Sequence, residues 1–360
     1  MSFPPQPLKR EMSLGGKLML PKLKGLSLLR SALALIVGLG LVAFLMRKME
    51  VRHLGELVGQ ASRPMLLLSA IALCGFYLVR AVRWAVILKW RVSTGPLFLY
   101  SSISYLVSSV FPPQVGELLR PGFLRARHRI PYFFALASVG VERLLDVASL
   151  FLLAFAALVS MPSHPPGADW LVRTLRTVGI FVAASLFILV IIVLRSAAFL
   201  RAVSRLLSFL RLPSRVARVC VEIISSLVAG TAVIGAPLYL CLAVTCSIVL
   251  WGMNAASVIL VFRALGVDLH FAAIILGFAV LSLGLVIPLM PAYIGQYEAL
   301  WVLAFLALGA RPQARVLASG LLCHVIILLV IALLGLLSLG LMALREGRKE
   351  DSPPEGLGAA

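Results

Sequence analysis

The chain has 360 residues, of which 61% are hydrophobic and 13% are charged, and this composition excludes a soluble globular protein and predicts a polytopic membrane protein. The formal net charge of +19 could indicate nucleic acid, but the basic residues lie between apolar runs rather than on one soluble face. We therefore assign them to membrane topology and to anionic lipid headgroups, and we expect no nucleic-acid partner.

Residues 1–30 are basic and punctuated by proline and glycine, which predicts a cytoplasmic N-terminal segment. A single transmembrane domain over residues 31–344 and a short cytoplasmic tail over residues 345–360 complete the expected organisation. Long apolar runs predict an all-α integral membrane helix bundle, because spanning helices satisfy their own backbone groups. About six full spans are expected, at about residues 31–46, 65–88, 132–161, 175–194, 236–262 and 316–344.

The segment between the second and third spans, residues 94–131, is apolar but is interrupted by Pro112 and Pro113. If it crossed completely, the arginines that follow would lie on the face opposite to those that end the second span, which the positive-inside rule disfavours. We therefore predict a broken helical hairpin that enters from the cytoplasm and returns, with its turn near residues 113–116. Such a turn implies a cavity, because non-helical backbone at membrane depth needs protein or water around it.

A second interrupted segment, residues 271–309, contains Pro288, Pro291 and Gly295 and is expected to enter from outside. With the six spans, the two interrupted segments bring the count to about eight hydrophobic segments. Both breaks place a glutamate shortly after a proline and a glycine, and this shared order indicates an inverted repeat. Inverted pairs of interrupted helices are typical of a transporter's midplane site, whereas ordinary proline kinks are the alternative. Residues 195–218 predict a basic amphipathic helix on the inner leaflet.

Ionisable side chains inside hydrophobic segments are costly unless paired or wetted, so they are functional candidates. Arg80 and Arg83 share a helix face and either anchor the helix at the interface or contact an anionic headgroup. Arg143 lies three residues before Asp146, so a structural ion pair between them is a further alternative. The candidate substrate-binding residues are Arg80, Arg83, Gly116, Glu117, Arg120, Glu142, Arg143, Asp146, Pro291, Gly295 and Glu298.

The sequence carries few signs of catalytic or metal chemistry. Its five cysteines and five histidines are dispersed without ligand spacing, and zinc-protease, nucleophile-elbow and Walker motifs do not occur. We therefore expect no metal, no cofactor, no catalytic residue and no enzymatic activity.

Four blocks of sequence, residues 80–84, 111–121, 141–146 and 287–298, resemble the transmembrane region of lysylphosphatidylglycerol synthases, the flippase-like domain family. The resemblance covers about residues 30–345 and implies an inner-membrane protein that moves or handles lipids. Ala292 departs from the family pattern, which commonly has glycine there, and this puts the flexibility of the second turn in doubt. The soluble aminoacyl-transfer domain of the full synthases has no counterpart, so lysyl transfer by this chain alone is not expected.

The expected function is that of a flippase-like transporter for an anionic or polyprenyl-type lipid, in the inner (cytoplasmic) membrane with both termini in the cytoplasm. Arginines would line the headgroup cavity, and Glu117, Asp146 and Glu298 would balance charge or relay protons. Two alternatives stay open: an accessory protein that recruits a partner to anionic lipid, and an intramembrane lipid-modifying enzyme. The sequence is compatible with a membrane-protein partner or a homo-oligomer.

Overall fold

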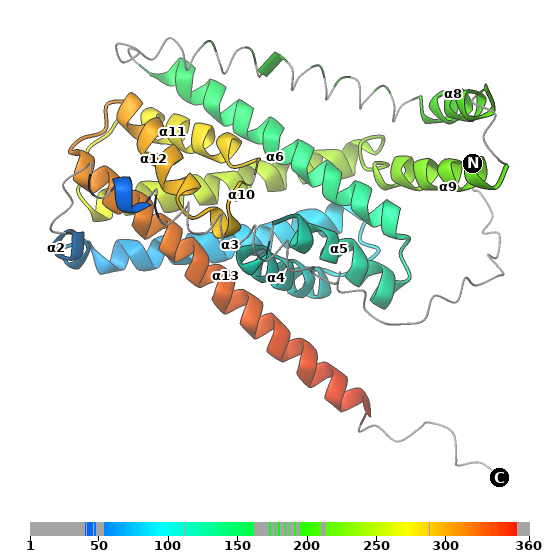
Figure 1. Ribbon diagram of the computed structural model, residues 1–360, viewed down its shortest axis with the longest axis horizontal. Helices are drawn as coiled ribbons and strands as arrows, with labels where there is room; N and C mark the ends of the chain where they lie inside the picture. Colours follow the sequence, from blue (N-terminus) through cyan, green and yellow to red (C-terminus); the bar gives the residue numbers. More distant parts are fainter. Residues whose placement is uncertain are drawn as a thin grey trace.

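The computed structural model describes residues 54–111, 113–161, 195–209, 214–287 and 289–350, together with isolated positions between 40 and 47 and between 173 and 191. These residues form a bundle of helices, which confirms the all-α membrane fold (Figure 1). The predicted N-terminal segment, most of the first and fourth predicted spans and the tail beyond residue 350 lie outside the described residues. The count of six full spans therefore stays a prediction.

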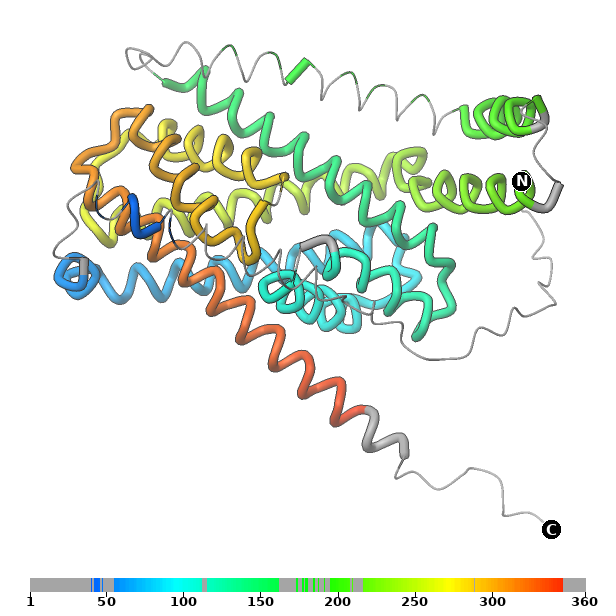
Figure 2. The backbone as a smooth tube through the Cα atoms, in the orientation of Figure 1, coloured from blue at the N-terminus to red at the C-terminus, as the bar shows by residue number. Residues whose placement is uncertain are grey.

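Four described helices are long and apolar enough to cross a membrane, and all four were expected from the sequence. They are α3 (Arg63–Ile87), α6 (Tyr132–Ser160), α10 (Pro237–Ala264) and α13 (Gln313–Glu350), whose apolar part ends at Arg345. Prolines lie in the first turn of α3 and of α10, where the missing N–H group has no intrahelical partner to lose. Helix α13 packs against α4, where Gly335 lies close to Leu106 and Ser102, and its C-terminal end extends beyond the other helices (Figure 2).

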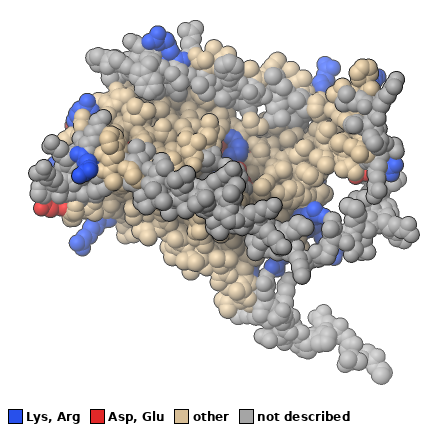
Figure 3. Space-filling view, in the orientation of Figure 1, with Lys and Arg blue, Asp and Glu red and all other residues tan. Residues whose placement is uncertain are grey.

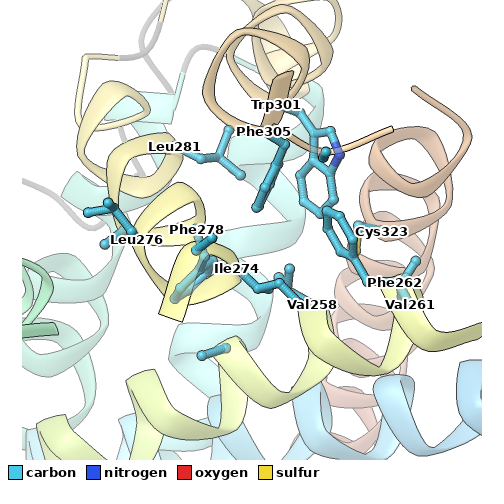
Figure 4. Packing of buried hydrophobic residues seen from close by; sticks show 14 of the residues in the cluster. Val258, Val261, Phe262, Ile274, Leu276, Phe278, Leu281, Trp301, Phe305 and Cys323 are labelled. Atoms are coloured by element: carbon cyan, nitrogen blue, oxygen red, sulfur yellow. The ribbon is translucent and has the colours of Figure 1, made fainter. Parts of the chain in front are cut away.

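The main apolar core lies between α10 and the three elements α11 (Phe271–Gly284), α12 (Gln296–Ala307) and α13 (Figure 4). Phe262 stacks on Trp301 with ring centroids 5.5 Å apart, and both rings contact Phe305 at 4.7 Å. Gly277 and Gly320 make room for these rings, because a Cβ atom at either position would lie within 2.8 Å of them. Since lipid is as apolar as these side chains, close van der Waals packing stabilises this core.

The first predicted break is present, but its position was predicted wrongly. Helix α4 (Thr94–Val110) ends at Phe111, and α5 (Pro113–His128) packs back against it. Residues 113–116 therefore form the first helical turn of α5 and are not part of the loop between α4 and α5. The physical reason is that proline is well tolerated in the first turn of a helix, so Pro113 starts α5 instead of interrupting the chain.

The second predicted break is also present, between α11 and α12. A short 3₁₀ turn, η1 (Pro291–Tyr293), interrupts the path, and Gly295 precedes α12 with φ of 80°. Ala292 and Tyr293 adopt left-handed φ values of 48° and 58°, which glycine would adopt without steric cost. Ala292 therefore holds this left-handed conformation under strain, and a glycine at this position would adopt it without strain.

The basic segment after the fourth predicted span forms two helices, so the prediction of a single amphipathic helix over residues 195–218 is wrong. They are α8 (Ser196–Phe209) and α9 (Ser214–Gly230), and the sequence has Pro213, which cannot continue a helix, directly before α9. Helix α9 packs against α6, and at its end Gly230 lies close to the carbonyl oxygen of Phe134. A short helix, α2 (Leu54–Gly59), precedes α3.

Candidate functional site

A cavity of about 560 Å³ lies inside the bundle, between α3, α4, α5 and α6 on one side and η1, α11 and α13 on the other. Charged and hydroxyl side chains line one part of it, and apolar side chains line the rest. In Figure 3 a small basic patch lies in a recess near the centre of the face shown, apart from the basic groups at the periphery. The cavity thus combines a polar chamber with an apolar wall.

Asp146, near the middle of α6, is the centre of the charged cluster. Arg80 lies 2.8 Å from its Oδ2 atom, and Arg83 lies 2.8 Å from its Oδ1 atom. The indole N–H of Trp251 also donates to Oδ1, at 3.2 Å. Because α3 packs against α10 and contacts α6, two arginines of one helix and a tryptophan of another meet on a single carboxylate.

Glu142, one turn earlier on α6, forms the buried end of the cluster. It lies 2.6 Å from Arg120 of α5 and 3.8 Å from Arg83, and all three side chains are almost completely inaccessible to solvent. The guanidinium of Arg120 also stacks over the ring of Trp84, 3.9 Å from its centroid. Arg83 donates a further hydrogen bond to the hydroxyl of Ser247, at 2.9 Å.

Arg143 and Glu117 form the accessible end of the same cluster. Their side chains are 2.5 Å apart, and about two fifths of each is exposed, at 41% and 43%. The predicted contact between Arg143 and Asp146 exists but is longer, at 3.6 Å. The nearer partner of Arg143 therefore belongs to α5, so the broken hairpin and α6 are joined by an ion pair at the edge of the cavity.

The cluster carries more positive charge than its own carboxylates neutralise. It holds the four arginines 80, 83, 120 and 143 against the three carboxylates 117, 142 and 146. Within the described part of the chain, several donors beside the cavity have no hydrogen-bond partner: Nε of Arg80, Nε of Arg143, Nη1 of Arg120 and the hydroxyl of Tyr105. Buried donors without partners favour an anion in the cavity.

A second polar group lies on the opposite wall, at the break before α12. Glu298 accepts the backbone N–H of Gly295 at 2.8 Å through Oε2, and its Oε1 lies 2.6 Å from Nδ1 of His324. The other ring nitrogen of His324, Nε2, lies 2.8 Å from the carbonyl oxygen of Ala292. Tyr297 stacks on the imidazole with centroids 4.4 Å apart. His324 thus connects helix α13 to both sides of the second break.

The structure brings most of the predicted residues together, in two groups. Those that line the cavity are Arg80, Gly116, Glu117, Arg120, Arg143 and Asp146, whereas Arg83 and Glu142 lie behind them and complete the ion pairs. Pro291, Gly295 and Glu298 shape the opposite wall, which Ala292, Tyr293, Tyr297 and His324 line. That any of them binds a substrate stays a prediction.

Sequence reasoning missed four members of the site: Tyr105, Ser247, Trp251 and His324. His324 had a usable signal, since it is a basic side chain within the apolar run 316–344. Trp251 stands in the middle of a span, away from the interfacial position that tryptophan prefers. The residues that the structure describes contain no group of three His, Cys, Asp or Glu fit to hold a metal.

Gly116 is needed for packing. A Cβ atom there would collide with the carbonyl oxygen of Ser104 and the hydroxyl of Ser108, both on α4. We expect Gly116→Ala to reduce the free energy of unfolding by about 1–3 kcal/mol, measured by SDS titration of the purified protein. Gly122→Ala is the matched control on the same helix, because a Cβ atom there meets nothing within 4 Å and alanine favours the helix. Equal effects at the two positions would contradict the packing role.

Three comparisons with known proteins bear on this site. The family model described as Lysylphosphatidylglycerol synthase TM region matches residues 31–335. A curated protein of Haloferax volcanii named Glycosyltransferase AglD is 25% identical over 304 residues, which cover 75% of this chain and 48% of that protein. The chain thus spans about half the length of this relative. No solved structure matches.

The glycosyltransferase name bears directly on the expectation that the chain is not an enzyme. That expectation is contradicted, because the relative is named for a group-transfer activity and the matched family is named after a synthase. The sequence reasoning rested on the absence of familiar catalytic motifs. Such motifs are specific to particular families, so their absence does not exclude catalysis by other arrangements.

Proposed function

The chain belongs to the lysylphosphatidylglycerol synthase TM region family, and on that premise we propose that it binds a membrane lipid by an anionic phosphate headgroup in the cavity and moves this headgroup across the membrane. The observation that carries the proposal is the polar chamber itself, whose arginine donors lack partners while an apolar wall adjoins them. We further place the protein in the inner membrane with both termini in the cytoplasm, as the distribution of basic residues favours.

The polar chamber suits a phosphate group. Guanidinium groups donate several N–H bonds in a fixed plane and bind phosphate oxygens well, and the cluster has one positive charge in excess of its carboxylates. Tyr105 adds a hydroxyl donor, and its ring lies 5.5 Å from the Arg80 guanidinium. A headgroup with a single negative charge would therefore neutralise the chamber.

The apolar wall suits the hydrocarbon part of the same molecule. It is formed by side chains from α3, α6, α10, α11 and α13, among them Leu73, Phe76, Leu150, Trp251, Phe278 and Ile327. A volume of about 560 Å³ is within the range of small-molecule sites, and it accommodates a headgroup with the first part of its chain. The remainder of an acyl or polyprenyl chain would stay in the bilayer.

Glu117 gives the site a way to bind and release its ligand. Its carboxylate pairs with the Arg143 guanidinium, and both side chains are partly exposed. An entering phosphate would compete with Glu117 for this guanidinium. Because exposed ion pairs contribute about 0–1 kcal/mol, the exchange costs little, and the lipid does not become trapped.

This competition gives the test of the proposed function. Arg143→Met should weaken binding of a fluorescent phosphatidylglycerol to the protein in nanodiscs about 10- to 100-fold, because it removes a charged donor. Glu117→Gln should tighten binding and slow lipid exchange between the leaflets of proteoliposomes, because it removes the competitor. Arg263→Met is the control, since Arg263 is exposed at the end of α10 and outside the cavity. Parent-like binding by Arg143→Met would contradict the proposal.

A second function is favoured by the relative named Glycosyltransferase AglD. In it the same cavity would hold a lipid phosphate while a sugar is transferred to or from that lipid. Lipid mass spectrometry of cells with and without the gene separates the two functions. Altered lipid structures would support group transfer, and an altered distribution between leaflets with unchanged structures would support transport.

A further inference from the structure

We propose that His324 and Glu298 form a proton-binding site that holds the second break closed, and that a proton bound there is coupled to the headgroup in the cavity. The inference deepens the proposed function, since it names the coupling ion and places its site on the wall opposite the arginines. The observation that supports the inference is that both ring nitrogens of His324 face acceptor oxygens.

The number of protons follows from the contacts. Nε2 of His324 faces the carbonyl oxygen of Ala292 at 2.8 Å, so this nitrogen must carry a hydrogen. Nδ1 faces Oε1 of Glu298 at 2.6 Å, so a second hydrogen must lie between them, on either atom. The pair therefore holds two hydrogens and is neutral overall, which suits its burial, with side-chain exposures of 6% and 4%.

Loss of one proton makes one of these contacts repulsive. If the remaining hydrogen stays on Nε2, the Nδ1 lone pair faces a carboxylate, and if it moves to Nδ1, the Nε2 lone pair faces a carbonyl oxygen. Glu298 is held in the first turn of α12 by the N–H of Gly295. The contact that opens is therefore the one to Ala292.

The backbone of the η1 turn is strained, and this strain favours a change of conformation once the contact between His324 and Ala292 is lost. Ala292 and Tyr293 both have left-handed backbone, which costs about 1 kcal/mol or more at residues other than glycine. Both residues line the cavity. Release of the carbonyl oxygen of Ala292 therefore lets the turn relax and changes the wall of the headgroup chamber.

The surroundings of the pair come from three elements. On α12 and α13, Tyr297 stacks on His324, and the hydroxyl of Tyr297 donates to the sulfur of Cys323. On η1, Tyr293 lines the same cavity as Arg80, Glu117 and Arg143. A phosphate bound among those arginines would thus change the field at η1, which is the physical route of coupling.

Hydrogen exchange of the η1 turn in the full-length protein in nanodiscs tests the site without lipid transport. The amides of Tyr293, Ile294 and Gly295 are hydrogen bonded in the closed turn. Glu298→Gln is the matched variant, because its amide donates to Nδ1 and accepts from Gly295 and so mimics the protonated carboxyl. At each pH, the ratio of parent to variant exchange cancels the intrinsic pH dependence.

We expect this ratio to be near one at low pH and then to rise about tenfold per pH unit, as release of one proton requires. A flat ratio between about pH 5 and 9 would overturn the proton site. His324→Phe keeps the ring stacked on Tyr297 but removes the donor, so it should exchange quickly at every pH; slow exchange would also overturn it. The parent and Glu298→Gln comparison decides the matter if this variant does not fold.

Phosphatidylglycerol then tests the coupling. Its addition should shift the pH at which the ratio rises in the parent protein and leave it unchanged in Arg143→Met. Bound lipid without any shift would overturn the coupling while the lipid site stands. A rising ratio without measurable lipid binding would instead overturn the proposed function while the proton site stands.

Discussion

Replacement of Asp146 by asparagine should reduce the free energy of unfolding by about 3–5 kcal/mol, because it leaves buried guanidinium groups without their carboxylate. Asp146 contacts Arg80 and Arg83 at 2.8 Å each, and the change raises the excess positive charge of the cluster. Water in the cavity can solvate part of Arg80, which lines it, but Arg83 is completely buried. The cost should therefore come mainly from Arg83.

The control for this change is Asp268→Asn. Asp268 is exposed in the loop between α10 and α11, so its replacement should alter the unfolding free energy by less than about 0.5 kcal/mol. SDS titration of the purified proteins measures both variants. A loss below about 1 kcal/mol for Asp146→Asn would mean that the arginines are adequately solvated and that the dry ion-pair network is not what holds α3 against α6.

Glu142→Gln should cost a similar amount, about 3–5 kcal/mol, for a more localised reason. Within the described residues Glu142 is the carboxylate that contacts Arg120, whereas Arg83 also reaches Asp146 and Ser247. The variant therefore leaves the Arg120 guanidinium buried against the ring of Trp84 without a carboxylate partner. Stacking on an aromatic face offsets only about 0.5–2 kcal/mol of that penalty.

A second change at Arg120 distinguishes loss of the ion pair from a general packing defect. Only in the first case should the second change restore stability. In Glu142→Gln/Arg120→Met the stranded charge is absent, and methionine packs on the face of Trp84. The double variant should be more stable than Glu142→Gln alone, by about 2 kcal/mol or more. A double variant that is less stable than the single one would show that the guanidinium stabilises this region by its shape and not through the ion pair.

Much of the site was visible from the sequence because charge in an apolar run is conspicuous. Arg80, Arg120, Glu142 and Asp146 each stand among hydrophobic neighbours, and the cost of unpaired charge in hydrocarbon required partners for them. The partners themselves were not predictable. The sequence favoured an Arg143 pair with Asp146 at helical spacing, whereas the closest partner of Arg143 is Glu117 of another helix.

The position of the first break shows a related limit. Proline and glycine between residues 112 and 116 indicate an interruption, but proline both ends helices and starts them. The choice depends on where α5 packs. Gly116 lies inside α5 because its missing side chain lets that helix approach Ser104 of α4, and this requirement appears only when the two helices are placed together.

By itself the sequence determined the membrane class, the helical fold, the spans that the structure describes, the family and the residues whose charge needs explanation. These features depend on local composition and on spacing along one helix. Only the tertiary structure decided which charges pair, that Ser247 and Trp251 of α10 complete the cluster, and that His324 clamps the second break. Such contacts join residues far apart in the chain, and they arise from how the helices cross, which no local pattern encodes.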